Sequence, residues 1–265
     1  MRKLCRQIRF TVNPFLEEDA DGFNSFAGKP CGQGVGVFFE LCVSLVGKAD
    51  SDTGFIVNIV DIDKQVRALI VPIFSGLVRA KWRGGEHVSF GDIFGVMRES
   101  ADILRGCFGS AIVSDLTFKL NPYRKISMDC EDYKMSYFSE KFEFAAMHKL
   151  WNEEFGAEKN FEVFGKCANP SGHGHNYTLE VTVRIDSGGG EFKVGEFERL
   201  VDELVIEAVD HKNLNKDVDG FAGVIPTIEN IAEFAWGKLE GAFGDAKLHS
   251  VTVWETDKTC CTYYG

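Results

Sequence analysis

The sequence of 265 residues contains no apolar run approaching the roughly 20 residues that cross a bilayer. Its start has basic residues but no uninterrupted apolar segment of the kind found in signal peptides. We therefore expect a cytoplasmic protein with no membrane partner. A surplus of basic charge is also missing, because 29 Lys and Arg stand against 40 Asp and Glu, a net charge of −11. This balance argues against nucleic acid as a partner, since non-specific binding needs a basic face.

Cysteine spacings typical of metal or redox sites are absent as well. The eight cysteines include no C-x-x-C pair, and a chain of this length does not need disulfides to hold its core together. We expect most of them to be reduced, buried, small side chains. Cys167 is the exception, because it lies in a loop rich in glycine, proline, asparagine and serine just before two histidines.

What the sequence does contain is an internal repeat. The segment FAGKPCGQGVGVFFELCVSL (26–45) aligns without a gap with FGKCANPSGHGHNYTLEVTV (164–183), and the same order of predicted elements follows in each half. The halves differ in charge, since residues up to 137 are neutral overall and 138–265 carry the whole net charge. We predict an α+β protein of two tandem domains, 1–135 and 136–265, each a four-stranded antiparallel sheet with two helices on one face.

Hydrophobic periodicity places the elements. In the second half it predicts strands at 141–150, 177–186 and 248–256, a helix from about 197 to 208, and a helix beginning at Pro226-Thr227 with Thr227 as its N-cap. In the first half it predicts strands at 6–12, 38–47, 55–60 and 114–120, and helices near 61–71 and 90–105.

Three histidines point to a metal site. His173 and His175 are two residues apart at the start of a strand, so both side chains leave the same face. Such a pair can also simply cover a polar strand face. His148 closes the preceding strand, and pairing of the two strands would bring a third imidazole alongside. Three histidines without a fourth protein ligand describe a catalytic zinc site, in which one position stays open.

Three further groups are candidates for chemistry or for substrate binding. Cys167 becomes a useful base or nucleophile only if an imidazole or a cation lowers its pKa. Asp210 and His211, in the motif DHKNL, could supply that imidazole, although a histidine at a helix end is also an ordinary helix cap. Glu255 alternates with the inward-facing Val251 and Val253, and is either a solvated residue at the strand end or a covered acceptor for a ligand with paired N–H donors.

These motifs resemble one family. FGKCANPSGHGHNY, HKL, DHKNLN, PTIEN and WETD at their relative spacings look like the 6-pyruvoyl-tetrahydropterin synthase family of the tunnelling fold, over about residues 140–265. The resemblance implies a zinc-dependent lyase that converts 7,8-dihydroneopterin triphosphate to 6-pyruvoyl-tetrahydropterin with loss of triphosphate, in tetrahydrobiopterin biosynthesis. It implies zinc ligands at His148, His173 and His175, a proton-transfer group of Cys167, Asp210 and His211, and substrate binding by Glu255 and Thr227.

The spacing C-x5-H-G-H resembles the pyruvoyl-forming branch, because related 6-carboxytetrahydropterin synthases have a shorter C-x3-H-G-H loop. A carboxy-forming or side-chain-cleaving enzyme on the same scaffold remains the alternative, followed by a non-catalytic zinc- or pterin-binding module. Lys149, Ile228 and Gly195 depart from the residues usual in the family at their positions.

The first copy loses each functional position. Alignment of the halves gives these equivalents: Pro14 for His148, Lys29 for Cys167, Val35 and Val37 for His173 and His175, Phe74 and Ser75 for Asp210 and His211, and Leu120 for Glu255. The resemblance further implies barrels assembled from several subunits with active sites between neighbours. We therefore expect a homo-oligomer, with a trimer favoured, in which catalytic domains form one ring and silent domains a second ring. The alternative is an arrangement in which the halves of one chain alternate around a barrel.

Overall fold

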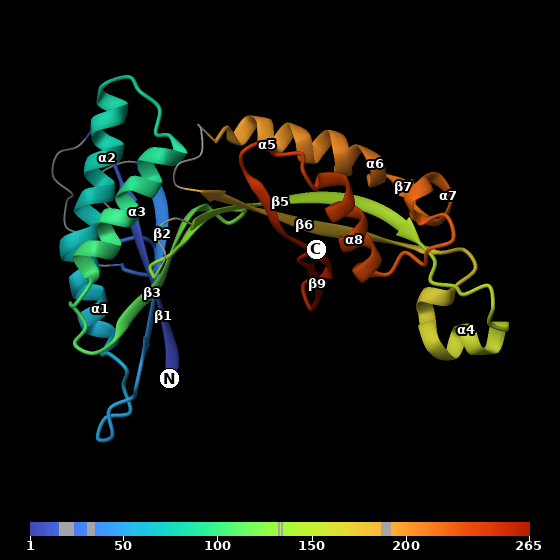
Figure 1. Ribbon diagram of the computed structural model, residues 1–265, viewed down its shortest axis with the longest axis horizontal. Coiled ribbons are helices and arrows are strands. Elements are labelled where there is room, and N and C mark those ends of the chain that lie inside the picture. Colours follow the sequence, from blue (N-terminus) through green and yellow to red (C-terminus); the bar gives the residue numbers. More distant parts are fainter. Residues whose placement is uncertain (16–23, 31–34, 132, 134, 187–191) are drawn as a thin grey trace. The chain divides into compact units, whose positions relative to one another are not determined.

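The structure is a computed structural model that describes residues 1–15, 24–30, 35–131, 133, 135–186 and 192–265 (Figure 1). The chain divides into two compact units. The first comprises Met1–Phe138 and Ile185–Phe192, and the second comprises Ser139–Arg184 and Lys193–Gly265. No helix of the described residues is both long and apolar enough to cross a membrane.

The described residues of the first unit form four strands, which follow one another in the sheet in the order of the sequence. They are β1 (Arg2–Val12), β2 (Val37–Gly47), β3 (Ile112–Asn121) and β4 (Arg124–Asp129). Each pairs antiparallel with the next, as the alternation of buried and exposed residues predicts for a sheet covered on one face. The predicted strands at 6–12, 38–47 and 114–120 are thereby confirmed.

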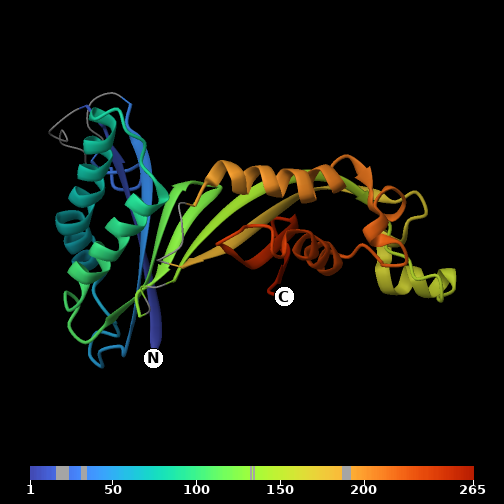
Figure 2. The same cartoon turned by 45° about the horizontal axis from the view of Figure 1, so that its top comes forward.

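Helices lie on one face of this sheet in both views of the molecule (Figures 1 and 2). They are α1 (Ile59–Gln65), a π-helical turn η1 (Val66–Ile70), α2 (Val71–Arg83) and α3 (Phe90–Leu104). Phe74 of α2 stacks on Phe118 of β3 with ring centroids 4.4 Å apart, and Phe10 and Phe39 complete a buried aromatic core. Burial of this aromatic surface holds the helices against the sheet.

One predicted element of the first unit is wrong. Residues 55–60, FIVNIV, form no strand. The Asn58 side chain accepts a hydrogen bond from the Val60 amide at 3.0 Å and caps α1. The first amides of a helix have no partner within the helix, and capping of one of them by Asn58 outweighs the β propensity of the isoleucines and valines. The helix therefore begins earlier than predicted, and it continues through η1 and α2 to Arg83.

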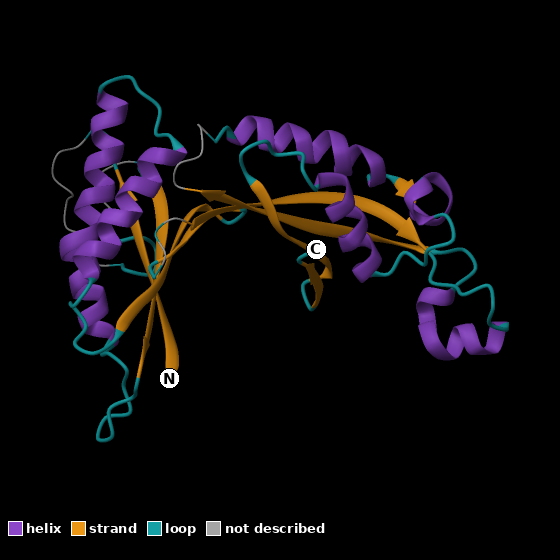
Figure 3. Cartoon of the chain, viewed as in Figure 1, coloured by secondary structure: helices purple, strands orange, loops and turns teal. Residues whose placement is uncertain are grey.

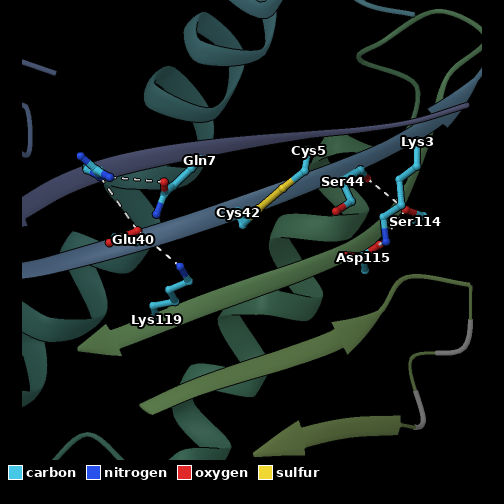
Figure 4. The surroundings of a disulfide bond; sticks show 10 residues. Lys3, Cys5, Gln7, Glu40, Cys42, Ser44, Ser114, Asp115 and Lys119 are labelled. Atoms are coloured by element: carbon cyan, nitrogen blue, oxygen red, sulfur yellow. Dashed lines mark hydrogen bonds and ion pairs between the residues drawn. A yellow bond between two sulfur atoms is a disulfide. The ribbon is translucent and has the colours of Figure 1, made fainter. Parts of the chain in front are cut away.

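The face of the first sheet without helices is polar and carries a disulfide (Figure 4). Cys5 and Cys42 are bonded, with Cα atoms 6.5 Å apart, between ion pairs of Lys3 with Asp115 and Lys119 with Glu40. This bond corrects the expectation of reduced thiols for two of the eight cysteines. The free cysteines among the described residues are partly or fully exposed rather than buried, and Cys31 lies outside the described residues.

The second unit combines a sheet with helices in the same manner (Figure 3). Its strands are β5 (Met135–His148), β6 (His173–Asp186), the two-residue β7 (Lys212–Asn213), β8 (Lys247–Thr256) and β9 (Thr259–Tyr263). The hydrogen-bonded order is β5–β6–β8–β9, and β7 pairs parallel with β5. The strand pairs β6–β8 and β8–β9 are antiparallel. A mixed α and β fold with an antiparallel sheet is therefore confirmed.

The helices of this unit are α4 (Ala157–Phe164), η2 (Gly165–Ala168), α5 (Val194–Val201), η3 (Asp202–Ile206), α6 (Glu207–Val209), α7 (Leu214–Asp217), η4 (Asp219–Phe221) and α8 (Ile228–Leu239). The two helices predicted for this unit, from about 197 to 208 and from Thr227, are present as α5 to α6 and as α8, and α4, η2, α7 and η4 are further helices that were not predicted from the sequence. Phe197 of α5 contacts Phe142 of β5, and α8 packs on β8 and β9. Thr227 caps α8 as predicted, accepting a hydrogen bond from the Asn230 amide at 3.4 Å.

The two units share three irregularities at aligned positions. The pairing of β2 with β3 shifts at Ser44/Leu45, where Ser114 of β3 is the extra residue, and the pairing of β6 with β8 shifts at Thr182/Val183, where His249 of β8 is the extra residue. A second pair of bulges lies in β3 at Lys119/Asn121 and in β8 at Trp254/Thr256. The long helix of each unit also contains a five-residue π segment, η1 or η3. Bulges and π turns are rare features that related domains retain. The tandem duplication stays a prediction, and these shared irregularities favour it.

Candidate functional site

The three predicted ligand histidines converge in the second unit. His148 is the last residue of β5, and His173 and His175 lie at alternate positions where the neighbouring β6 begins. Gly172, which precedes β6, has a positive φ of 70°, and a Cβ there would meet the His148 carbonyl oxygen at 3.0 Å. A glycine at this position lets the loop reach the end of β5.

The geometry of the cluster suits a metal ion. The Nε2 atoms of His148 and His173 are 3.1 Å apart, and one ligand atom from each of the three histidines lies within 4.8 Å of the others. Two nitrogens bound to one tetrahedral zinc at about 2.05 Å would be about 3.3 Å apart. Nε2 of His175 is buried and has no hydrogen-bond partner among the described residues. Three imidazoles with this spacing could hold a metal ion, and the structure does not identify which metal.

Groups around His148 orient its ring. Nδ1 lies 2.8 Å from the Pro226 carbonyl oxygen and 3.3 Å from the Tyr177 hydroxyl. A carbonyl accepts only from a protonated Nδ1, so Nε2 keeps its lone pair toward the other histidines. Burial, followed by the neighbouring imidazoles, lowers the pKa of His148 although the Pro226 carbonyl opposes this shift. The neutral imidazole is the form that ligates a metal.

Glu255 lies against the histidines. Its Oε1 is 3.5 Å from Nε2 of His175 and 3.6 Å from Nε2 of His148, and its side chain is 22% exposed. The residue falls within the second bulge of β8, and bulges redirect side chains next to active sites. Of the two interpretations of Glu255, the structure therefore favours the covered acceptor over the solvated strand end.

Cys167 lies in the short helix η2 on the loop that leads to His173. Its carbonyl oxygen accepts a hydrogen bond from the Leu150 amide at 2.9 Å, which fastens the loop to the chain just after His148. Burial, with a smaller effect of the Glu255 charge, raises the pKa of the Cys167 thiol. Within the described part of one chain, no group lowers this pKa as the sequence led us to expect.

Asp210 and His211 form a hydrogen-bonded pair. Oδ2 of Asp210 lies 2.8 Å from Nδ1 of His211, and Oδ1 accepts from the Ala145 amide of β5 at 2.8 Å. The Ala145 amide, above all, holds the pKa of Asp210 below its ordinary value. His211 has a positive φ of 55°, which is uncommon outside glycine, and its side chain is 83% exposed. The backbone thus presents this imidazole to the outside of the unit.

The structure joins only some of the predicted residues. Among the described residues of one chain, no hydrogen bond or ion pair links the exposed His211 to Cys167. Thr227 lies next to Pro226, whose carbonyl orients His148, and its hydroxyl caps α8. A cavity of about 690 Å³ opens beside Gly172, but none of the eight predicted residues lines it.

Comparison with known proteins bears on this site. The family model described as 6-pyruvoyl tetrahydropterin synthase matches residues 137–265. The human 6-pyruvoyl tetrahydrobiopterin synthase is 38% identical over 130 residues, which cover 48% of this chain and 90% of that protein. The chain belongs to the 6-pyruvoyl tetrahydropterin synthase family. All eight predicted site residues fall inside the matched region, and the first 136 residues fall outside it.

Two further proteins are similar to this chain. A 6-carboxy-5,6,7,8-tetrahydropterin synthase of Aquifex aeolicus is 30% identical over 156 residues, covering 47% of this chain and 95% of that protein. A solved 6-pyruvoyl tetrahydropterin synthase of Caenorhabditis elegans is 35% identical, covers 49% of this chain and 96% of its own, and superposes with a TM-score of 0.46.

Sequence reasoning missed two groups of the site. Tyr177 lies two residues beyond His175 on the same face of β6. The alternation of side chains between the two faces of a strand could have indicated it. No sequence signal indicates the Pro226 carbonyl, because every residue has a backbone oxygen and only the fold selects this one.

Proposed function

We propose that this protein converts 7,8-dihydroneopterin triphosphate to 6-pyruvoyl-tetrahydropterin with loss of triphosphate, and that the reaction depends on zinc. The observation that carries the proposal is the convergence of His148, His173 and His175 with Glu255 beside them, in a chain of the 6-pyruvoyl tetrahydropterin synthase family. The three histidines would hold the ion. Zinc would act as a Lewis acid toward substrate oxygens when bound there.

The remaining side chains take roles that their surroundings support. Glu255, acceptor-only when ionised and mostly shielded from solvent, would bind the paired N–H donors of the pterin ring. Thr227 would contribute to the same substrate pocket. Cys167 would remove and return a carbon-bound proton of the side chain. Asp210 holds Nδ1 of His211, so that Nε2 is the nitrogen available to take a proton from the thiol.

The Cys167 thiol needs a partner to ionise, and we propose that His211 of a neighbouring subunit supplies it. Among the described residues of one chain, Glu255 is the only charged group that acts on the partly buried thiol, whereas His211 is turned toward solvent. A site divided between subunits satisfies both observations. It also requires that second units associate with second units in the homo-oligomer, for which we propose a trimer.

We further propose that the first unit is a degenerate, non-catalytic copy of the second. Supporting this are the shared bulges and π segments, and the side chains that replace the functional residues. Phe74, aligned with Asp210, is fully buried in the aromatic core of the first unit. A residue in that position cannot orient a histidine.

Product identification tests the proposed function. Purified protein with zinc is incubated with 7,8-dihydroneopterin triphosphate under reducing, oxygen-free conditions, and the pterin product and released triphosphate are measured by mass spectrometry and ion chromatography. We expect the full-length pyruvoyl side chain and one triphosphate per turnover, with Cys167→Ala as the inactive control. A shortened side chain would instead identify the carboxy-forming or side-chain-cleaving alternative, and no turnover would leave a binding module.

A further inference from the structure

The cavity of about 690 Å³ beside Gly172 begins next to the three clustered histidines, and its volume is within the range of small-molecule sites. Three of its lining residues directly adjoin a group of the histidine site in the sequence. They are Lys149 after His148, Gly172 before His173, and Ile225 before Pro226. The loop before α4 and the segment around α7 also line it, and both lie at the same end of β5 and β6 (Figures 1 and 2). A ligand held at the histidines can therefore extend into this cavity.

Lys149 brings a positive charge into the cavity. Its backbone is fixed, because its amide donates to Oδ1 of Asn215 at 2.7 Å and its carbonyl oxygen accepts from Nδ2 of Asn215 at 2.9 Å. Its Nζ lies over the ring of Trp151, 4.7 Å from the ring centroid. The face of an aromatic ring attracts a cation but does not neutralise its charge. Nζ has no ion pair or hydrogen bond among the described residues, so its donors are available to a ligand.

Three other charged side chains line the same cavity. Lys216 of α7 adds a second positive charge, and Glu153 and Glu154 add two negative charges. These three side chains are exposed to solvent, whereas Lys149 is half-buried. Because water and salt screen exposed charges more strongly than partly buried ones, the charge of Lys149 is the least screened of the four.

We propose that this cavity holds the triphosphate of the substrate and that Lys149 is its anchor. The inference rests on the proposed function, which supplies a substrate with a triphosphate arm. Residues 138–265 carry the whole net charge of −11, so the part of the chain with the histidines repels a polyanion unless a local cation attracts it. A lysine ammonium is a compact point charge that binds phosphate oxygens. Since Lys149 directly follows His148, the pterin side chain and the triphosphate can be held at the same time.

Substitutions of opposite effect test this assignment in the full chain. Lys149→Gln removes the charge, Lys149→Arg keeps it, and Glu153→Gln/Glu154→Gln removes the two carboxylates. Lys159→Gln is the matched control, because Nζ of Lys159 in α4 lies over the Phe155 ring at 3.9 Å and Lys159 does not line the cavity. Binding of inorganic triphosphate is measured by titration calorimetry on protein freed of metal with a chelator, so that a metal ion does not bind the anion. Thermal melts verify that each variant is folded.

We expect Lys149→Gln to bind inorganic triphosphate about tenfold or more weakly than the unaltered protein, because a charge-assisted hydrogen bond is lost. Lys149→Arg should restore most of the affinity, the double glutamate variant should bind more tightly, and Lys159→Gln should bind like the unaltered protein. Equal affinity of Lys149→Gln and Lys159→Gln overturns the proposal, and so does the absence of triphosphate binding by the unaltered protein. If Lys149→Gln does not fold, an unchanged affinity of the double glutamate variant overturns it instead.

Turnover of 7,8-dihydroneopterin triphosphate by the zinc-loaded protein separates this proposal from the proposed function. An unchanged KM in Lys149→Gln would reject the triphosphate site and leave the proposed function standing. Triphosphate binding that depends on Lys149, without turnover by the unaltered protein, would reject the proposed function and leave the anion site in place.

Discussion

Replacement of a single ligand histidine gives the sharpest test of the metal site. His173 is the best choice, because it is only half-buried and its Nδ1 has no hydrogen-bond partner among the described residues, so its loss should cost the metal-free fold little. His148, by contrast, is fully buried and bonded to Pro226, and its removal would damage the fold itself. We predict about one zinc per chain in the unaltered protein and close to none in His173→Ala.

The size of the effect on stability follows from mass action. An ion present at 100 times its dissociation constant stabilises the folded state by about 2.7 kcal/mol, which raises the melting temperature of a domain of this size by roughly 10 °C. The assay combines metal quantification by mass spectrometry with thermal melts, with and without a chelator. Zinc should raise the melting temperature of the unaltered protein and of the control His87→Ala, whose histidine lies outside the cluster.

Chelation should make the unaltered protein and His173→Ala melt at the same temperature. Two outcomes would refute the reasoning. Two zinc ions per chain would mean that a second cluster exists beyond the three histidines. Full zinc content in His173→Ala would mean that the ligand set has been assigned wrongly.

Three further predictions concern the proton-transfer group. Cys167→Ala should keep zinc and fold but lose about 10²- to 10⁴-fold in turnover, since the thiol acts as a base and not as a ligand; full activity would move that role elsewhere. The pKa of Asp210 is lowered in the folded state, so its carboxylate stabilises the fold above the unfolded pKa, and this stabilisation is lost as the pH falls through the folded pKa. The urea midpoints of the unaltered protein and of Asp210→Asn should therefore converge at acid pH. Mixed Cys167→Ala and His211→Ala chains should recover some activity if the site is shared between subunits, and no recovery despite demonstrated subunit exchange would argue against it.

Much of the site could be predicted because it depends on short-range geometry. The alternation of side chains along a strand places His173 and His175 on one face. A strand that ends at His148 can pair with the strand that begins at His173 and so bring the third imidazole alongside. The capping role of Thr227 is equally local. These predictions need only the sequence and the dimensions of the elements.

Other features depend on register, which the sequence does not reveal. Cys5 faces Ser44 and Gln7 faces Cys42 across β1 and β2, so the two cysteines are diagonal neighbours on the polar face and form a bond. A shift of one residue in the pairing would have turned one strand over and separated them. The same holds for Glu255, because the bulge in β8 decides whether its carboxylate meets the histidines or solvent.

The predicted strand at 55–60 failed for a different reason, and that reason bears on the first unit as a whole. β-branched residues favour a strand only where a neighbouring strand can pair with them, and here Asn58 instead satisfies an orphan amide of α1. The helix that follows then continues through η1 into α2 and places Phe74 in the aromatic core of the first unit. Under the proposal that the first unit is a non-catalytic copy, the position aligned with Asp210 has a structural role instead, because Phe74 strengthens the aromatic core.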